Sequence, residues 1–188
     1  VGENHRLTIE AANPGEATVD GANRVASLFH LESAPSVTLR NLRLLYFTRA
    51  GAYAYRSPHF TLDRCVLYPG TGWVSGSAVF AFLSPNPTVT RSLVVGGTSG
   101  IYLLESPNAT IRNNTVSQQM FAGVAYAFSL RGSVQTNNSI GFGSNDCVSA
   151  EMHHPDELKS FRSDYNNLGT NVSVFNQARA QREPDLWK

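Results

Sequence analysis

The chain has 188 residues, of which 41% are hydrophobic and 15% charged, and this composition fits one domain or one segment of a solenoid. The formal net charge is +1 and no run of Lys or Arg occurs, so we expect neither nucleic acid nor an anionic membrane surface as a partner. No stretch approaches the roughly 18 apolar residues that a spanning helix needs, so we predict no membrane insertion.

Most of the chain consists of one repeat of about 23 residues, whose first copy covers residues 7–20. Further copies follow near residues 28–44, 51–67, 78–94, 100–116, 123–139 and 146–165. Most copies hold Pro four positions before an aliphatic residue, and these aliphatic residues lie 23, 27, 22 and 23 positions apart: Leu39, Leu62, Val89, Ile111 and Val134. Such a regular interval indicates a repeat protein.

Each copy contains short stretches of alternating apolar and polar residues separated by turn residues, without helical periodicity. A unit of this kind cannot bury its apolar face alone, whereas stacked copies form a continuous core. The leucine spacing of leucine-rich repeats is missing. We therefore predict an all-β fold, a parallel β-helix solenoid of about seven rungs stacked about 4.8 Å apart.

Three sets of equivalent residues are expected to stack inside the solenoid. Two sets are apolar and lie two positions apart, as strand alternation requires: Phe29, Ala52, Val79, Ile101 and Val124, and Leu31, Ala54, Ala81, Leu103 and Tyr126. The third set becomes polar along the chain: Leu42, Cys65, Ser92, Asn114, Asn137 and Asp164. We expect its Asn side chains to bond from coil to coil as a ladder, because an isolated buried amide costs about 1–3 kcal/mol.

The first copy, which runs from Leu7-Thr8-Ile9 through Asn13-Pro14-Gly15 to Val19-Asp20-Gly21, resembles an early rung of the pectate-lyase-like superfamily. The stretch Ser163-Asp164-Tyr165-Asn166 resembles the closing rung of that superfamily, which includes periplasmic copper-site maturation proteins and alginate-modifying enzymes. The resemblance covers nearly the whole chain and implies a right-handed parallel β-helix, but it does not imply an activity.

We also make predictions about how the repeat region begins and ends. Relatives usually begin with a strand and an amphipathic helix that cap the coil, and none precedes Leu7, so we expect a missing N-terminal cap and further chain upstream. Residues 1–168 are assigned to the β-helix and residues 169–188 to a C-terminal capping tail, with a short helix at 176–182.

A Gly-rich loop at 68–76 lengthens one rung and carries Trp73, which either binds a ligand or lies flat over the outer strand.

The two cysteines, Cys65 and Cys147, fall in different columns four rungs apart. Four rungs correspond to roughly 19 Å, whereas a disulfide tolerates a Cα separation of only about 7 Å. We therefore predict two buried free thiols.

The outward positions of one strand are mostly aromatic in successive copies, and we interpret them as a platform for sugar rings, whose C–H faces pack on aromatic rings. The alternative is that other residues cover this stripe. The column His30, Tyr53, Phe80 and Tyr102 lies beside Glu32, Tyr55, Phe82 and Leu104, and then beside Ser33, Arg56, Leu83 and Glu105.

Four of these residues are candidates for lyase-type β-elimination on a uronate polymer. Arg56 would pair with the substrate carboxylate, His30 or Tyr53 would act as the base, and Tyr102 would act as the acid. The predicted substrate-binding residues are Tyr55, Phe80, Phe82, Trp73, Glu32 and Glu105.

Other chemistries fit the sequence less well. A glycoside hydrolase needs two carboxylates about 5–9 Å apart, whereas Glu32 and Glu105 are three rungs apart. The run His153-His154-Pro155-Asp156 has the residues of an alginate-epimerase motif in the wrong order, and adjacent His residues in an extended loop point in opposite directions, so no metal site is predicted. No cofactor is predicted, and a calcium requirement is left open because no motif indicates one.

These patterns favour a carbohydrate-active β-helix of the cell exterior, either extracellular or in the cell envelope or periplasm. Its expected partner is an acidic polysaccharide, which it binds or cleaves. The alternative is a non-catalytic structural or adhesive segment of a larger surface protein.

Overall fold

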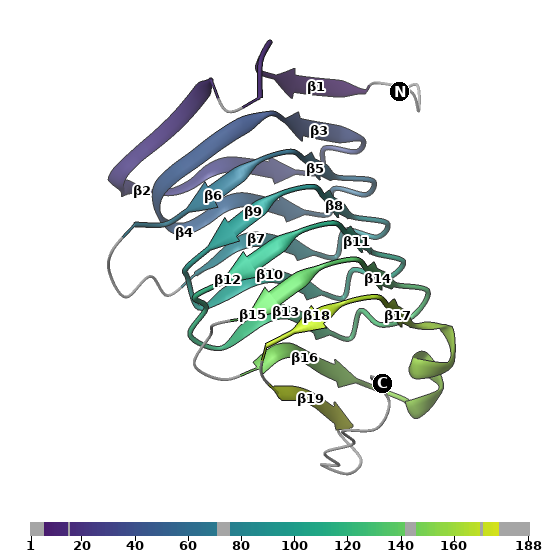
Figure 1. Cartoon of the computed structure of the whole chain (residues 1–188). Coiled ribbons are helices and arrows are strands. Elements are labelled where there is room, and N and C mark those ends of the chain that lie inside the picture. The colour runs from purple at the N-terminus through teal and green to yellow at the C-terminus, as the bar shows by residue number, and fades with distance from the viewer. Residues whose placement is uncertain (1–5, 15, 71–75, 142–145, 170, 177–188) are drawn as a thin grey trace.

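The computed structural model describes residues 6–14, 16–70, 76–141, 146–169 and 171–176. These residues form a coil with three walls of parallel strands (Figure 1). The first wall is a seven-stranded sheet of β1 (Leu7–Glu10), β3 (Val37–Arg40), β5 (Thr61–Asp63), β8 (Thr88–Thr90), β11 (Thr110–Arg112), β14 (Val134–Thr136) and β17 (Arg162–Asp164). Seven stacked strands correspond to about six full turns of the coil, close to the seven rungs expected.

The other two walls share a second, twelve-stranded sheet, because two long strands bend from one wall into the next. These long strands are β2 (Ala17–Glu32) and β4 (Leu42–Tyr55). The second wall continues with β6 (Val66–Tyr68), β9 (Leu93–Val95), β12 (Thr115–Ser117), β15 (Ser139–Gly141) and β18 (Asn167–Leu168). The third wall continues with β7 (Ser77–Phe82), β10 (Ser99–Leu104), β13 (Ala122–Ala127), β16 (Asp146–Met152) and β19 (Asn171–Asn176). One short 3₁₀ helix, η1 (Pro155–Ser160), lies before β17.

Side chains alternate between the interior of the coil and its surface, and the two predicted apolar columns are confirmed. In the third wall Ala52 pairs with Val79, Val79 with Ile101, and Ile101 with Val124. The column that contains Leu103 and Tyr126 lies two residues further on, in the same register. Nearly all of these inward side chains are buried, so each coil covers the apolar face of the next.

The predicted column of aliphatic anchors is wrong at its last member. Ile111 pairs with Gln135, whereas Val134 pairs with Thr110 on the neighbouring position. The cause is one extra residue in the turn that precedes β14: Ser106 stacks on Ser129, but Ile111 follows five residues later and Gln135 six. The buried Gln135 side chain accepts a hydrogen bond of 2.9 Å from the Tyr126 hydroxyl, which explains a polar residue at this inward position.

The same extra residue changes which residues form the predicted asparagine ladder. Asn114, Asn138 and Asn166 form it, in place of the predicted Asn114, Asn137 and Asp164. The Asn114 carboxamide donates to Asn138 Oδ1 at 3.0 Å, and the Asn138 carboxamide donates to Asn166 Oδ1 at 3.0 Å. Asn137 instead sits exposed at a corner with φ of +54°, a left-handed conformation that Asn tolerates better than most residues.

A second polar ladder, which the sequence analysis missed, consists of serines at another corner of the coil: Ser57, Ser84, Ser106 and Ser129. Each of the last three hydroxyls accepts the backbone N–H of the serine one coil earlier, at 2.8–3.0 Å. All four residues are fully buried, so the ladder gives every hydroxyl a partner where water cannot reach.

The two cysteines are buried free thiols, as predicted. The Cys65 thiol bonds to the Asp63 carbonyl oxygen at 3.4 Å, and the Cys147 thiol bonds to the Ile140 carbonyl oxygen at 3.0 Å. Burial raises the pKa of Cys65 above its ordinary value of 9.0, so this thiol stays protonated and unreactive at neutral pH.

Part of the predicted tail continues the coil. Asn171–Asn176 forms strand β19, which pairs in parallel with β16. The predicted helix at 176–182 lies outside the described residues except for Asn176, which ends β19. Trp73 and residues 71–75 around it also lie outside the described residues.

We expect Asn138→Ala to lower the free energy of unfolding by about 2–3 kcal/mol, because it leaves the buried N–H groups of Asn114 without an acceptor. The matched control is Asn137→Gly, which keeps the left-handed backbone at an exposed position and should cost less than about 0.5 kcal/mol. Urea denaturation followed by circular dichroism measures both. Equal losses in the two variants would contradict the ladder described above.

Asp63 is buried on the first wall and accepts two hydrogen bonds from Arg91, at 2.8 and 2.7 Å. Burial alone would raise the pKa of Asp63, but hydrogen bonds from Arg91 and Thr90 and the charges of Arg91 and Arg40 lower it below its ordinary value of 3.8. A lowered folded-state pKa contributes stability that is complete above the unfolded-state pKa and is lost as the pH falls through the folded-state value.

Asp63→Asn should therefore cost about 2 kcal/mol at pH 7, and a smaller amount as the pH falls below about 3.8. The measurement is urea denaturation of both proteins between pH 7 and pH 3. Asp20→Asn, at an exposed position, serves as the control and should follow the wild type. A constant difference between Asp63→Asn and the wild type across this range would show that the carboxylate charge does not stabilise the fold.

Candidate functional site

A continuous stripe of aromatic rings lies on the outside of the third wall, on strands β4, β7 and β10. The ring centroids of Tyr53 and Phe80 are 5.3 Å apart, and those of Phe80 and Tyr102 are 5.0 Å apart with the planes 11° from parallel. A second column runs beside the first, with Tyr55 stacked on Phe82 at 5.3 Å. The five rings are half-buried against one another, so each keeps part of its surface open to solvent.

The stripe exists because the strands pair without offset: Tyr53 lies opposite Phe80, and Phe80 opposite Tyr102. Parallel strands are separated by about 4.8 Å, which is close to the spacing of stacked rings. The backbone register therefore forces the aromatic side chains into contact.

Two arginines flank this stripe. The Arg49 guanidinium lies 5.0 Å from the centre of the Tyr53 ring, and the Arg56 guanidinium lies 5.0 Å from the centre of the Tyr55 ring. Both arginines are exposed, so the rings position their charges without removing them from solvent.

A hollow of about 250 Å³, named here the Arg49 hollow, opens at one side of the stripe. Its lining includes Arg49, Ser77, Phe80, Ser99, Tyr102 and Phe121. Ser77 and Ser99 are paired on neighbouring strands. Among the described residues, the lining thus combines one arginine, three aromatic residues and the hydroxyl-bearing residues Ser77, Thr98 and Ser99.

A second hollow of about 340 Å³, named here the Glu151 hollow, lies on the other side of Tyr102 and Phe121, which line both hollows. Its lining includes Ala125, Ala127, Ser149 and Glu151. Ala125 and Ser149 occupy the positions that Tyr53, Phe80 and Tyr102 hold in earlier coils. The hollow forms because the side chains in this column become small after Tyr102.

Tyr102 stands between the two hollows. Burial, together with the negative charge of Glu151, raises the pKa of Tyr102 above its ordinary value of 10. The hydroxyl is therefore protonated at neutral pH and can donate a hydrogen bond or a proton.

The structure brings some of the predicted catalytic residues together and keeps others apart. The His30 and Tyr53 rings are in contact, with centroids 4.9 Å apart. His30 and Tyr102, however, are three strands apart on the same wall, which corresponds to roughly 14 Å. A base and an acid at that separation cannot act on the same sugar unit, because each must reach its proton within hydrogen-bond distance.

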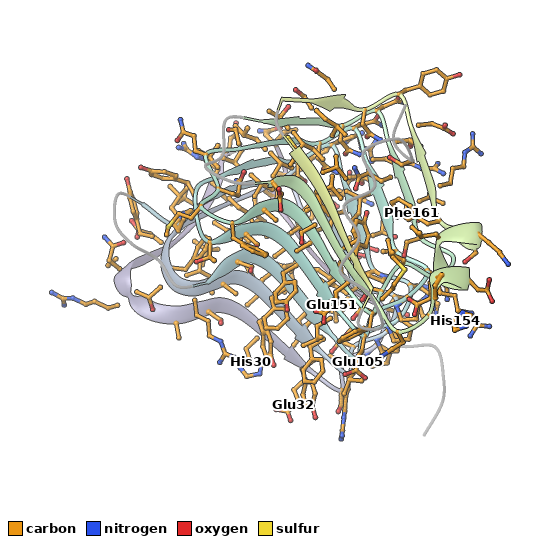
Figure 2. All side chains as sticks on the ribbon, turned by 90° about the horizontal axis from the view of Figure 1, so that it is seen from below. His30, Glu32, Glu105, Glu151, His154 and Phe161 are labelled. Carbon is orange, nitrogen blue, oxygen red and sulfur yellow. The ribbon has the colours of Figure 1, made fainter. Side chains whose placement is uncertain are left out.

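The predicted charged residues also spread along the wall. Figure 2 shows His30, Glu32 and Glu105 on the same outer side of the coil. Glu32 lies opposite Tyr55 at the outer end of the stripe, and Glu105 takes a left-handed corner position with φ of +46°. The Arg56 guanidinium lies over the Tyr55 ring, and Arg56 is absent from the described lining of both hollows. The arginine that lines the first hollow is Arg49.

Three residues of the site were missed by the sequence analysis: Arg49, Phe121 and Glu151. Arg49 and Phe121 lie where the coil bends into the third wall, outside the alternating pattern that the repeat made visible. Glu151 could have been found, since it continues the outward column that contains Phe82, Leu104 and Ala127.

The histidine-rich segment has a structural role at another corner of the coil, where Figure 2 labels His154. The His154 Nδ1 accepts the backbone N–H of Asp156 at 3.2 Å, and Glu157 Oε1 accepts the backbone N–H groups of His153 and His154. These contacts form a capping box at the start of η1. The His153 ring stacks on Phe128 with centroids 3.9 Å apart.

Comparison with known proteins defines the family. A family model described as a right-handed β-helix region matches residues 27–178, and the chain belongs to this family. No match to a curated protein was found. Among the described residues, no helix has the length and apolar character needed to cross a membrane.

Proposed function

We propose that the third wall binds an acidic polysaccharide. The supporting observation is the stripe of stacked, half-exposed rings flanked by Arg49 and Arg56. Sugar rings present C–H faces that pack on aromatic faces, and guanidinium groups pair with carboxylates in a two-point geometry. A right-handed β-helix is compatible with either a carbohydrate-active or a structural role, so the surface of this wall carries the proposal.

The polymer would lie across successive coils, with its rings over Tyr53, Phe80 and Tyr102. The proposed location is therefore the cell exterior, either extracellular or in the cell envelope or periplasm, where such polymers occur. The alternative is an adhesive or spacer segment without a carbohydrate ligand, and the following experiment distinguishes it from the proposed polysaccharide binding.

The double variant Phe80→Ala/Tyr102→Ala is expected to weaken binding to polygalacturonate about ten-fold or more, because it removes the two central rings of the stripe. Affinity electrophoresis through gels that contain polygalacturonate, alginate or neutral dextran measures this. The control is Tyr165→Ala, since Tyr165 is 87% exposed and lies outside the stripe. If the wild type shows no retardation by either acidic polymer, the spacer alternative stands.

Lyase-type β-elimination is a second candidate, favoured by the joint presence of Arg49 and Tyr102 in one hollow. Arg49 would neutralise the uronate carboxylate, and the protonated Tyr102 would donate to the leaving oxygen. The wide separation of His30 from Tyr102 argues against His30 as the base, and the alternative base, Tyr53, lies two strands from Tyr102, which corresponds to roughly 10 Å. Binding without cleavage is therefore the function we favour.

Binding without cleavage predicts that no ultraviolet absorbance of unsaturated uronate appears when the protein is incubated with polygalacturonate or alginate, with and without calcium. It also predicts that Tyr102→Phe, which keeps the ring and removes the hydroxyl, binds the polymer as the wild type does to within about two-fold. Unsaturated product that the wild type forms and Tyr102→Phe does not would establish the lyase instead.

A further inference from the structure

The aromatic column of the third wall ends at Tyr102, whose ring differs in one respect from the ring before it. Phe80 has an aromatic ring on either side, with the Tyr53 centroid 5.3 Å away and the Tyr102 centroid 5.0 Å away. Tyr102 stacks on Phe80 on one side only, because the next residue of the column, Ala125, has no ring. The other face of the Tyr102 ring is therefore directed toward the coil of Ala125, and Tyr102 lines the Glu151 hollow at this place.

The Glu151 hollow has room for one sugar ring. Its volume of about 340 Å³ lies at the lower end of the range of about 300–1,000 Å³ that drug-sized ligands occupy. Successive parallel strands lie about 4.8 Å apart, so a ring placed over Ala125 would be one coil spacing from Tyr102. This is close to the 5.0 Å between the Phe80 and Tyr102 centroids, so the hollow can hold the ring that the column lacks.

Ser149 indicates a ligand that carries hydroxyl groups. It lies opposite Ala125 in the next coil, lines the hollow and is only 8% exposed. In the described part of the chain, no residue forms a hydrogen bond with its hydroxyl. Buried hydroxyls nearly always have a partner, and one that lines a hollow can obtain it from a ligand. A sugar packs its C–H face on an aromatic ring and also exchanges hydrogen bonds, whereas a purely aromatic ligand would leave Ser149 without a partner.

We propose that the Glu151 hollow is a subsite for one pyranose ring, which stacks on the outer face of Tyr102 and bonds to the Ser149 hydroxyl. The ligand ring continues the aromatic column where the rings of the protein end. This inference rests on the proposed function and adds a subsite at the end of the stripe. A polysaccharide that follows Tyr53, Phe80 and Tyr102 places its next sugar over Ala125.

The alanine methyl groups report whether a sugar enters the hollow. Methyl spectra of the alanine-labelled whole chain are recorded during titration with hexagalacturonate and, separately, with a hexamannuronate fragment of alginate. The signals of Ala125 and Ala127, which line the hollow, should shift. The signals of Ala52 and Ala81, which are buried inside the coil, should stay in place and serve as the control.

Ala125→Phe fills the hollow with a further ring of the column. The subsite predicts that this variant binds the same hexasaccharide about ten-fold more weakly, because its own ring occupies the place of the sugar. A polymer that used the stripe alone would bind as before or more tightly, since the variant adds an aromatic ring. Isothermal titration calorimetry measures the affinity, and Leu93→Phe, which adds a ring at an exposed position of the second wall, should bind as the wild type does.

Ser149→Ala removes the hydroxyl and leaves the hollow open. It should weaken binding about three-fold or more without lowering the thermal melting temperature, since no described residue bonds to this hydroxyl. The matched control is Ser139→Ala on the second wall, an exposed serine outside the hollow, which should change neither quantity. Because Ser149→Ala adds no bulk, it tests the subsite even if Ala125→Phe does not fold.

The outcomes separate the subsite from the proposed function. Binding by the wild type without shifts at Ala125 and Ala127, and with wild-type affinity in Ser149→Ala, would overturn the subsite and leave polysaccharide binding by the stripe in place. Tighter binding by folded Ala125→Phe would overturn it as well. Binding of neither hexasaccharide, together with no retardation by the acidic polymers, would overturn the proposed function and this inference with it.

Discussion

Parallel backbone pairing from coil to coil is the constraint on which the rest of this molecule depends. Each strand bonds to the equivalent strand of the next coil, so a residue meets its own counterpart about 4.8 Å away. Apolar residues thereby form continuous columns, and a buried polar residue is tolerated only if its counterpart offers a partner. The Asn114–Asn138 and Ser84–Ser106 contacts satisfy this requirement from one coil to the next.

The same constraint shapes the surface. It stacks Tyr53, Phe80 and Tyr102 into one stripe, and it also determines where that stripe ends, because the next counterparts are Ala125 and Ser149. A change from large to small side chains within one column produces a hollow, which Phe121 and Glu151 also line. The candidate site thus arises where the size of the side chains changes on a regular scaffold. Its chemistry comes from the charged residues at its edges.

The sequence predicted the fold and the columns of the third wall because a regular interval of about 23 residues shows directly which residues must stack. It failed where one residue was inserted: the aliphatic Val134 appeared to continue a column that the buried Gln135 in fact occupies. The prediction assigned the inward position to the apolar residue of the two. The polar Gln135 occupies it because the Tyr126 hydroxyl provides a hydrogen-bond partner inside the coil. The aromatic stripe was predictable from the repeat, whereas Arg49 lies at a bend, where no pattern in one copy specifies the position of a side chain.

The register between β11 and β14 tests this account most directly, since the ladders and the outward columns all follow from such pairing. Nuclear Overhauser spectra of methyl-labelled protein report it through the contacts of the Val134 methyl groups. The account predicts a strong cross-peak between the methyl groups of Val134 and Thr110, which lie opposite each other on one face of the first wall. A strong cross-peak from Val134 to Ile111, without one to Thr110, would contradict it, because these two residues would then stack inside the coil.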